Sequence, residues 1–107
     1  MRAHEFLDRA SELVKGDRER QHGDKLENHD NIAAGWDAYI RRLVYRRYRL
    51  TLPLAPCVKA EDAANMMEIL KVMRRLAGEF NQDDYTDGAG YAGVSGEIAS
   101  RRKDCGA

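Results

Sequence analysis

The sequence predicts an all-α protein, a four-helix bundle that is completed by oligomerisation, and three observations support this. Apolar residues recur at helical spacing in four segments, and no segment of useful length alternates as a strand would. Polar or Pro-containing stretches separate the four segments. A chain of 107 residues can bury only a modest core, so we expect one domain over 1–107 that gains core by pairing with further copies.

Each helix is expected from its apolar stripe and from the residues that would end it. Gly16 follows the first stripe, and Pro53 and Pro56 break the chain after the second. Of the third helix, we expect the stripe that contains Met66 and Met73 to face the core, with Lys71 and Arg74 on the outer face. The expected helices are about 3–15, 26–48, 60–78 and 83–101, with a basic helix end and Pro-containing loop at about 41–57 and a frayed tail at about 102–107.

Composition excludes some classes of protein. The formal net charge is zero, which argues against a dedicated nucleic-acid or membrane-surface protein, although charge can still be clustered locally. No apolar run approaches the roughly 20 residues of a membrane helix, and the amphipathic, partly acidic N-terminus does not resemble a secretory signal. The two distant cysteines suggest reduced thiols. We therefore expect a cytoplasmic protein without a membrane or nucleic-acid partner.

Three aspartates lie in line with apolar stripes, which is unusual because a carboxylate aimed at a core must be paired, hydrogen-bonded or bound to a metal. Asp62 begins the third helix, and Asp83 and Asp87 lie one turn apart on the fourth. Together they could hold a divalent cation such as Mg²⁺. A helix cap or dipole partner would equally explain Asp62 and Asp83. Asp87 is the hardest to explain in that way, because it lies inside its helix ahead of Gly90 and Tyr91.

Three further sets of polar residues could bind a ligand. Lys71 and Arg74 are spaced to hold phosphate oxygens, although a solvated face is the more usual reason for such a pair. Arg18 and His22 lie in a Gly-containing connector, where an exposed histidine is commonplace. The basic segment interleaves arginine with tyrosine, which suits phosphate contact and base stacking, but a solvated helix end or an oligomer contact is the simpler interpretation. Its members are Arg41, Arg42, Tyr45, Arg46, Arg47, Tyr48 and Arg49.

The fourth helix is rich in glycine, with Gly88, Gly90, Gly93 and Gly96 inside nine residues. Each glycine costs up to about 1 kcal/mol in a helix interior, so close approach of another helix or of a ligand is a physical reason to keep them. Such a face would also suit contact between copies.

Two stretches of the chain resemble a family of small, uncharacterised phage and prophage proteins. They are GDRERQHGDKLENHDNIAAGW and EDAANMMEILKVMRRLAGEFNQDDYTDGAGYAGVSGEI, and the resemblance covers about residues 16–99 without the 45–57 loop. His22 stands where the family pattern usually has tyrosine. More distantly, the layout resembles the MazG-like all-α nucleoside triphosphate pyrophosphohydrolases, which are dimers or tetramers that bind magnesium through ExxE and ExxD motifs.

The MazG-like resemblance implies a function, although both motifs depart from the family pattern. Here Glu27 to Asp30 reads ExxD and Asp84 to Asp87 reads DxxD, and a helix intervenes between the two. The implied reaction is magnesium-dependent cleavage of a nucleoside triphosphate to the monophosphate and pyrophosphate. Asp62, Asp83, Asp87 and Glu27 would hold the metal, Glu27, Asp62 and Asp87 would be the catalytic residues, and the nucleotide would contact Arg18, His22, Asn28, Lys71, Arg74 and Tyr91.

Two other functions remain open at this point. The poor match of the first motif favours a non-catalytic module that binds a nucleotide as an oligomer. Alternatively, the chain is a structural or interaction protein, in which Asp62 and Asp87 are satisfied by basic side chains across the core and the glycines serve helix contact.

Overall fold

The computed structural model describes residues 1–15 and 25–104, with side chains described up to Arg101. The described chain is all-α, with four helices and no strand, as the sequence predicts. They are α1 (Ala3–Val14), α3 (Lys25–Tyr48), α4 (Ala60–Arg74) and α5 (Gln82–Asp104).

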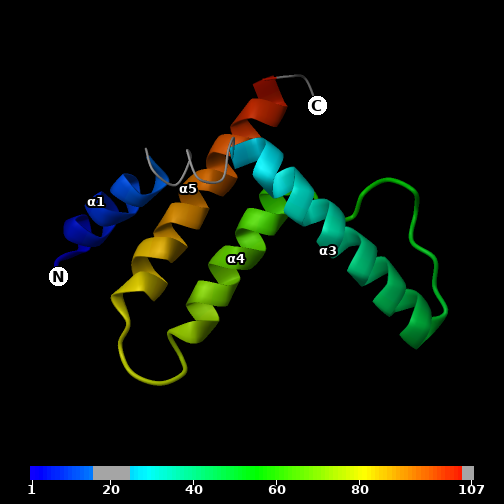
Figure 1. The fold of residues 1–107 in the computed structure, drawn as a ribbon, viewed down its shortest axis with the longest axis horizontal. Helices are drawn as coiled ribbons and strands as arrows, with labels where there is room; N and C mark the ends of the chain where they lie inside the picture. The colour runs from blue at the N-terminus through cyan, green and yellow to red at the C-terminus, as the bar shows by residue number, and fades with distance from the viewer. Residues whose placement is uncertain (16–24, 105–107) are drawn as a thin grey trace.

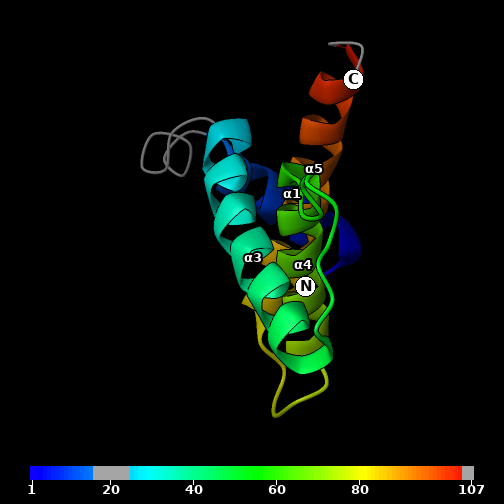
Figure 2. The ribbon, with the colours of Figure 1, turned by 90° about the vertical axis from the view of Figure 1, so that its right-hand side faces the viewer.

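The helices are arranged around α5 and α4, which run antiparallel and side by side (Figure 1). Helix α1 packs on the other side of α5, and α3 crosses the N-terminal end of α4 before diverging from it (Figures 1 and 2). The C-terminal half of α3 and the loop that follows it therefore extend away from α1 and α5 (Figure 1).

Two small clusters form the core, and alanine dominates both. Ala60 and Ala64 of α4 pack with Val94 and Ile98 of α5, and Val14 and Leu26 cover this cluster. In the second cluster, α3 meets the start of α4 through Ala33, Val58 and Ala63, covered by Ile32, Trp36 and Ile40. Alanines let helix backbones approach closely, but they bury little apolar area, and many large apolar side chains of this chain are exposed.

The orientation of α4 is opposite to the sequence prediction. Lys71 lies on the side that packs against α5, and 13% of its side chain is exposed, whereas Met66 and Met73 face outward. The outward face, called here the α4 stripe, has five large apolar residues that are between 38% and 58% exposed: Met66, Ile69, Leu70, Val72 and Met73. The prediction was wrong because it assumed that the apolar stripe of a helix faces the core of its own chain.

The helix ends differ from the predicted ones by up to four residues. Helix α4 ends at Arg74, and the chain turns at Gly78, whose φ of 78° favours glycine. Helix α5 continues to Asp104, beyond the predicted end at 101, whereas residues 105–107 of the predicted tail lie outside the described part. Within the described residues, no helix is long and apolar enough to cross a membrane.

The glycines of α5 divide into two pairs. A Cβ at Gly88 would lie 2.5 Å from the Arg75 guanidinium, and one at Gly90 would lie 3.3 Å from Val14 on α1. The close neighbours at these two positions are side chains, whereas the expectation was the close approach of another helix backbone or of a ligand. A Cβ at Gly93 or Gly96 would meet no atom within 4 Å, so packing within this chain does not require those glycines.

Candidate functional site

A largely buried ion pair joins α4 and α5. It belongs to a line of polar contacts between these two helices, which we call the seam. Lys71 Nζ lies 3.1 Å from Asp87 Oδ2, and only 13% and 15% of the two side chains are exposed. Asp87 makes a further interaction as well. The anomalous carboxylate of the sequence is therefore paired with a lysine of the neighbouring helix, which removes most of the cost of burying it.

One turn earlier on α5, Asp84 continues the seam. Its carboxylate is 7% exposed and lies 3.5 Å from Arg74 Nε, while its backbone carbonyl accepts hydrogen bonds of 3.1 and 3.3 Å from the Arg75 guanidinium. That guanidinium also stacks over the Tyr85 ring, 4.4 Å from its centroid. Because Gly88 has no side chain, Arg75 can lie flat against α5 at this level.

At the other end of the seam, α4 and α5 are joined by neutral groups. The Ser95 hydroxyl donates to the Asn65 side-chain oxygen at 2.6 Å and lies 3.4 Å from the Glu61 carbonyl. The seam thus runs from a charged end near Asp84 to a neutral end near Ser95. Sequence reasoning missed Arg75 and Asn65, and it named Asp84 only as part of the DxxD motif.

The other predicted site residues do not gather on the seam. Asp62 accepts the Lys59 backbone N–H at 2.9 Å, so it caps α4 as the simpler interpretation of the sequence held. Asp83 lies exposed in the first turn of α5, and its backbone N–H donates a hydrogen bond to the Asn81 side-chain oxygen. Glu27 lies exposed in the first turn of α3 and makes an interaction of its own.

The remaining predicted residues are placed as follows. Asn28 on α3 and Tyr91 on α5 are half-buried. The neighbouring His29 is buried, with Nδ1 2.9 Å from the Lys25 carbonyl. Arg18 and His22 lie outside the described residues.

The predicted magnesium site does not fit the part of the chain that the structure describes. No group of three or more His, Cys, Asp or Glu residues lies close enough there to hold a metal ion. Asp62 is committed to its helix cap, and Lys71 already supplies the positive charge beside Asp87. Magnesium requires several oxygen ligands in nearly octahedral geometry, and these residues do not provide them.

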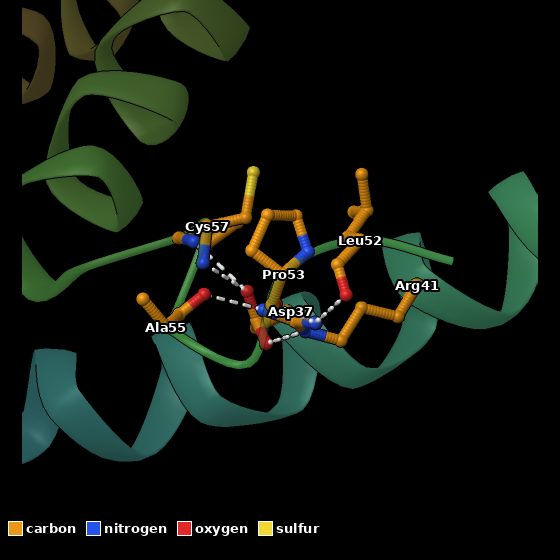
Figure 3. A network of polar contacts seen from close by, with 7 residues as sticks. Asp37, Arg41, Leu52, Pro53, Ala55 and Cys57 are labelled. Atoms are coloured by element: carbon orange, nitrogen blue, oxygen red, sulfur yellow. Dashed lines mark hydrogen bonds and ion pairs between the residues drawn. The ribbon is translucent and has the colours of Figure 1, made fainter. Parts of the chain in front are cut away.

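A second polar network, which the sequence analysis did not identify, holds the 49–59 loop to α3 (Figure 3). Asp37 accepts the N–H groups of Cys57 and Val58 at 2.7 and 2.9 Å, and Arg41 Nε donates to it at 2.6 Å. Arg41 also donates to three carbonyls of the loop, those of Leu52, Pro53 and Ala55. The available sequence signal was an acid and an arginine four residues apart on one helix. That spacing does not indicate that the pair also contacts the loop.

The Asp37 network predicts a pH dependence of stability. The Arg41 side-chain hydrogen bond, followed by the backbone N–H of Val58, lowers the pKa of Asp37 below its ordinary value of 3.8. The folded pKa is the lower one, so the network stabilises the fold fully above the unfolded pKa and its contribution is lost as pH falls through the folded pKa. We expect Asp37→Asn to be less stable at neutral pH and to show a weaker loss of stability on acidification below about pH 4.

Denaturant unfolding between pH 2 and pH 7 measures this dependence. Asp8→Asn on α1 is a control with the same charge change at an exposed position. Identical pH profiles of Asp37→Asn and the wild type would contradict the prediction.

Comparison with known proteins identifies the family. A family described as a domain of unknown function, DUF6378, matches residues 5–99. The chain belongs to this family. DUF6378 thus spans all four described helices, and its name carries no activity.

Two curated relatives place this DUF6378 chain among phage-related proteins. It is 38% identical over 89 residues to the Gene 55 protein of Mycobacterium phage L5, covering 83% of this chain and 49% of the relative. It is 28% identical over 88 residues to the Gene 55 protein of Mycobacterium phage D29, covering 82% and 49%. The match thus spans about half the length of each relative. No solved structure matches the chain.

Proposed function

We propose that this chain acts as a self-associating interaction module, in which a second copy covers the α4 stripe. The observation that carries the proposal is the contrast between the two faces of α4. On the polar face, Lys71 and Arg74 contact Asp87 and Asp84 of the same chain, whereas the apolar face is left largely exposed by the residues that the structure describes. The charged groups to which the sequence assigned chemistry thus pair with one another. The apolar groups that were assigned to the core remain exposed in the part of the chain that the structure describes.

The spacing of the α4 stripe suits a helix as its partner. Met66, Ile69 and Met73 follow one another at intervals of three and four residues, which is the spacing of apolar residues in helices that pack side by side. A contiguous apolar face of this kind is unusual on a monomer and typical of an interaction site. A second copy presents the same face in a two-fold pair, which is the commonest symmetry of soluble oligomers.

Light scattering coupled to size exclusion tests this proposal. We expect a mass of two or four chains at micromolar concentration, with dissociation only on strong dilution. A clean monomer of 12.2 kDa at micromolar concentration would contradict it.

A second candidate is nucleotide handling, and the placement of the DxxD motif favours it. On the seam Asp84 is buried and Asp87 is largely buried, and each contacts a cation of α4. The phosphates of a bound nucleotide could take the place of these carboxylates as the anions that contact Lys71 and Arg74. Because the described acids do not fit magnesium, this geometry supports binding better than pyrophosphate release, and we derive no catalytic step.

Incubation with a nucleotide panel and magnesium separates the alternatives. Binding without catalysis predicts a thermal shift by a nucleoside triphosphate without magnesium, with the ligand recovered intact and the shift lost in Lys71→Gln. Release of pyrophosphate that Asp87→Asn abolishes would instead establish the pyrophosphohydrolase of the MazG-like resemblance. If neither a thermal shift nor pyrophosphate release is observed, the interaction module remains as the sole proposal.

A further inference from the structure

The zero net charge of this chain conceals a strong separation of charge. Residues 38–60 contain five arginines, one lysine and no acidic residue. The rest of the chain then carries 12 basic residues against all 18 acidic ones, a net charge of −6. The basic part is the C-terminal half of α3 and its loop, which extends away from α1 and α5 (Figure 1).

Most of this positive charge is available to a ligand. Arg41 is used within the chain, by Asp37 and the loop carbonyls. Within residues 1–15 and 25–101, no ion pair is formed by the other four arginines, which are Arg42, Arg46, Arg47 and Arg49, and all four are exposed. Four cations held close together repel one another, so this part of α3 gains from an anion.

A groove lies along one face of this half of α3. Its volume is about 450 Å³, and it is lined by Tyr39, Arg42, Leu43, Arg46 and Arg47. These residues are spaced at i, i+3, i+4, i+7 and i+8, so they share a face about 12 Å long. The lining combines an aromatic ring and an aliphatic side chain with three guanidinium groups, which suits a ligand that has flat rings and regularly spaced negative charges.

The tyrosines of this segment are exposed, and one is already stacked by arginine. Tyr39 is 69% exposed and Tyr48 is 67% exposed. The guanidinium groups of Arg42 and Arg49 lie over the Tyr45 ring, 5.8 and 5.4 Å from its centroid. Arg49 holds this position with a φ of 58°, a conformation that glycine or asparagine would adopt at lower cost.

We propose that this arginine–tyrosine face of α3 binds single-stranded nucleic acid. The guanidinium groups of Arg42, Arg46 and Arg47 would contact backbone phosphates, and the exposed ring of Tyr39 would stack on an unpaired base. A single strand is preferred to a duplex because the exposed aromatic faces match only bases that are free to stack. The face is distinct from the seam and from the α4 stripe.

Fluorescence anisotropy with a labelled 15-nucleotide single strand of mixed sequence tests the proposal with the whole chain. Three phosphate contacts predict a roughly twentyfold loss of affinity between 50 and 200 mM salt. The double variant Arg42→Gln/Arg46→Gln should bind about tenfold or more weakly and show a smaller salt dependence. Arg2→Gln/Arg9→Gln, with the same charge change on α1, should bind as the wild type does.

A second pair of variants tests stacking separately from charge. Tyr39→Ala should lose about tenfold in affinity, and Tyr39→Phe should retain it, because only the ring is required. Circular dichroism and light scattering verify that each variant is folded and keeps its oligomeric state.

Several outcomes would overturn the proposal. They are absence of binding at 50 mM salt, equal weakening by the α1 control, equal affinity for base-free polyphosphate or for duplex DNA, and competition by a mononucleotide at micromolar concentration. A changed mass of the Arg42→Gln/Arg46→Gln variant would instead assign the face to contact between copies and would equally overturn it.

Discussion

Replacing Lys71 with methionine should destabilise the fold by about 3 kcal/mol, because the substitution removes the ammonium group that lies 3.1 Å from the largely buried Asp87 carboxylate. Lys71 and Asp87 are 13% and 15% exposed, so solvent replaces little of the lost interaction. Methionine keeps most of the aliphatic stem of lysine, which limits the loss of packing. Chemical denaturation of Lys71→Met against the wild type, at a fixed chain concentration, gives the free energy of unfolding directly.

The double variant Lys71→Met/Asp87→Asn provides the internal test. Removing both charges should recover more than half of the lost stability, since the cost lies in keeping the Asp87 charge after its Lys71 partner is lost. Arg9→Met is a matched control, because Arg9 pairs with Glu12 at the same 3.1 Å but with 54% and 69% of the side chains exposed. It should change stability by less than about 0.5 kcal/mol. Equal effects of Lys71→Met and Arg9→Met would contradict the buried pair.

A charge placed on the α4 stripe should abolish self-association and leave the helical content unchanged. Ile69→Glu and Met73→Glu each put a carboxylate at a position that is 58% or 52% exposed in one chain but buried in the proposed pair. Burial of an unpaired carboxylate is costly, so the dissociation constant should rise by at least about a hundredfold. The isolated fold tolerates the charge because these positions face solvent in the single chain.

Leu54→Glu is the matched control for this experiment. Leu54 is also a large apolar residue, and it is fully exposed in the 49–59 loop, away from the α4 stripe. This variant should keep the mass and dissociation constant of the wild type. Loss of association in Leu54→Glu, or retained association in both α4 variants, would assign the interface to another surface.

The seam and the α4 stripe show how far helical periodicity reaches. Periodicity correctly separated the apolar side of α4 from its cationic side and correctly marked Asp87 as a residue that needs a partner. It could not say which side faces the same chain, because a stripe looks alike whether it is covered by α5 or by another molecule. Lys71 was therefore expected on the outer face of α4, but it lies on the face that packs against α5.

The Asp37 network shows a second limit. Asp37 and Arg41 form an ordinary i, i+4 pair on α3, and such pairs are commonly exposed and weak. The loop contacts join residues up to 21 positions apart, so only the path of the chain after Pro53 brings them together. Sequence spacing alone could not distinguish this network from a solvated pair.

The sequence by itself determined the all-α class, the order of the four helices with their approximate ends, and the concentration of positive charge after Asp37. These features depend on local propensity, periodicity and composition, which act over a few turns of a helix. The tertiary structure decided the partner of Asp87 and the outward orientation of the α4 stripe. Both depend on how the helices pack against one another, and alanine-rich contacts set that packing without a sequence signal of comparable strength.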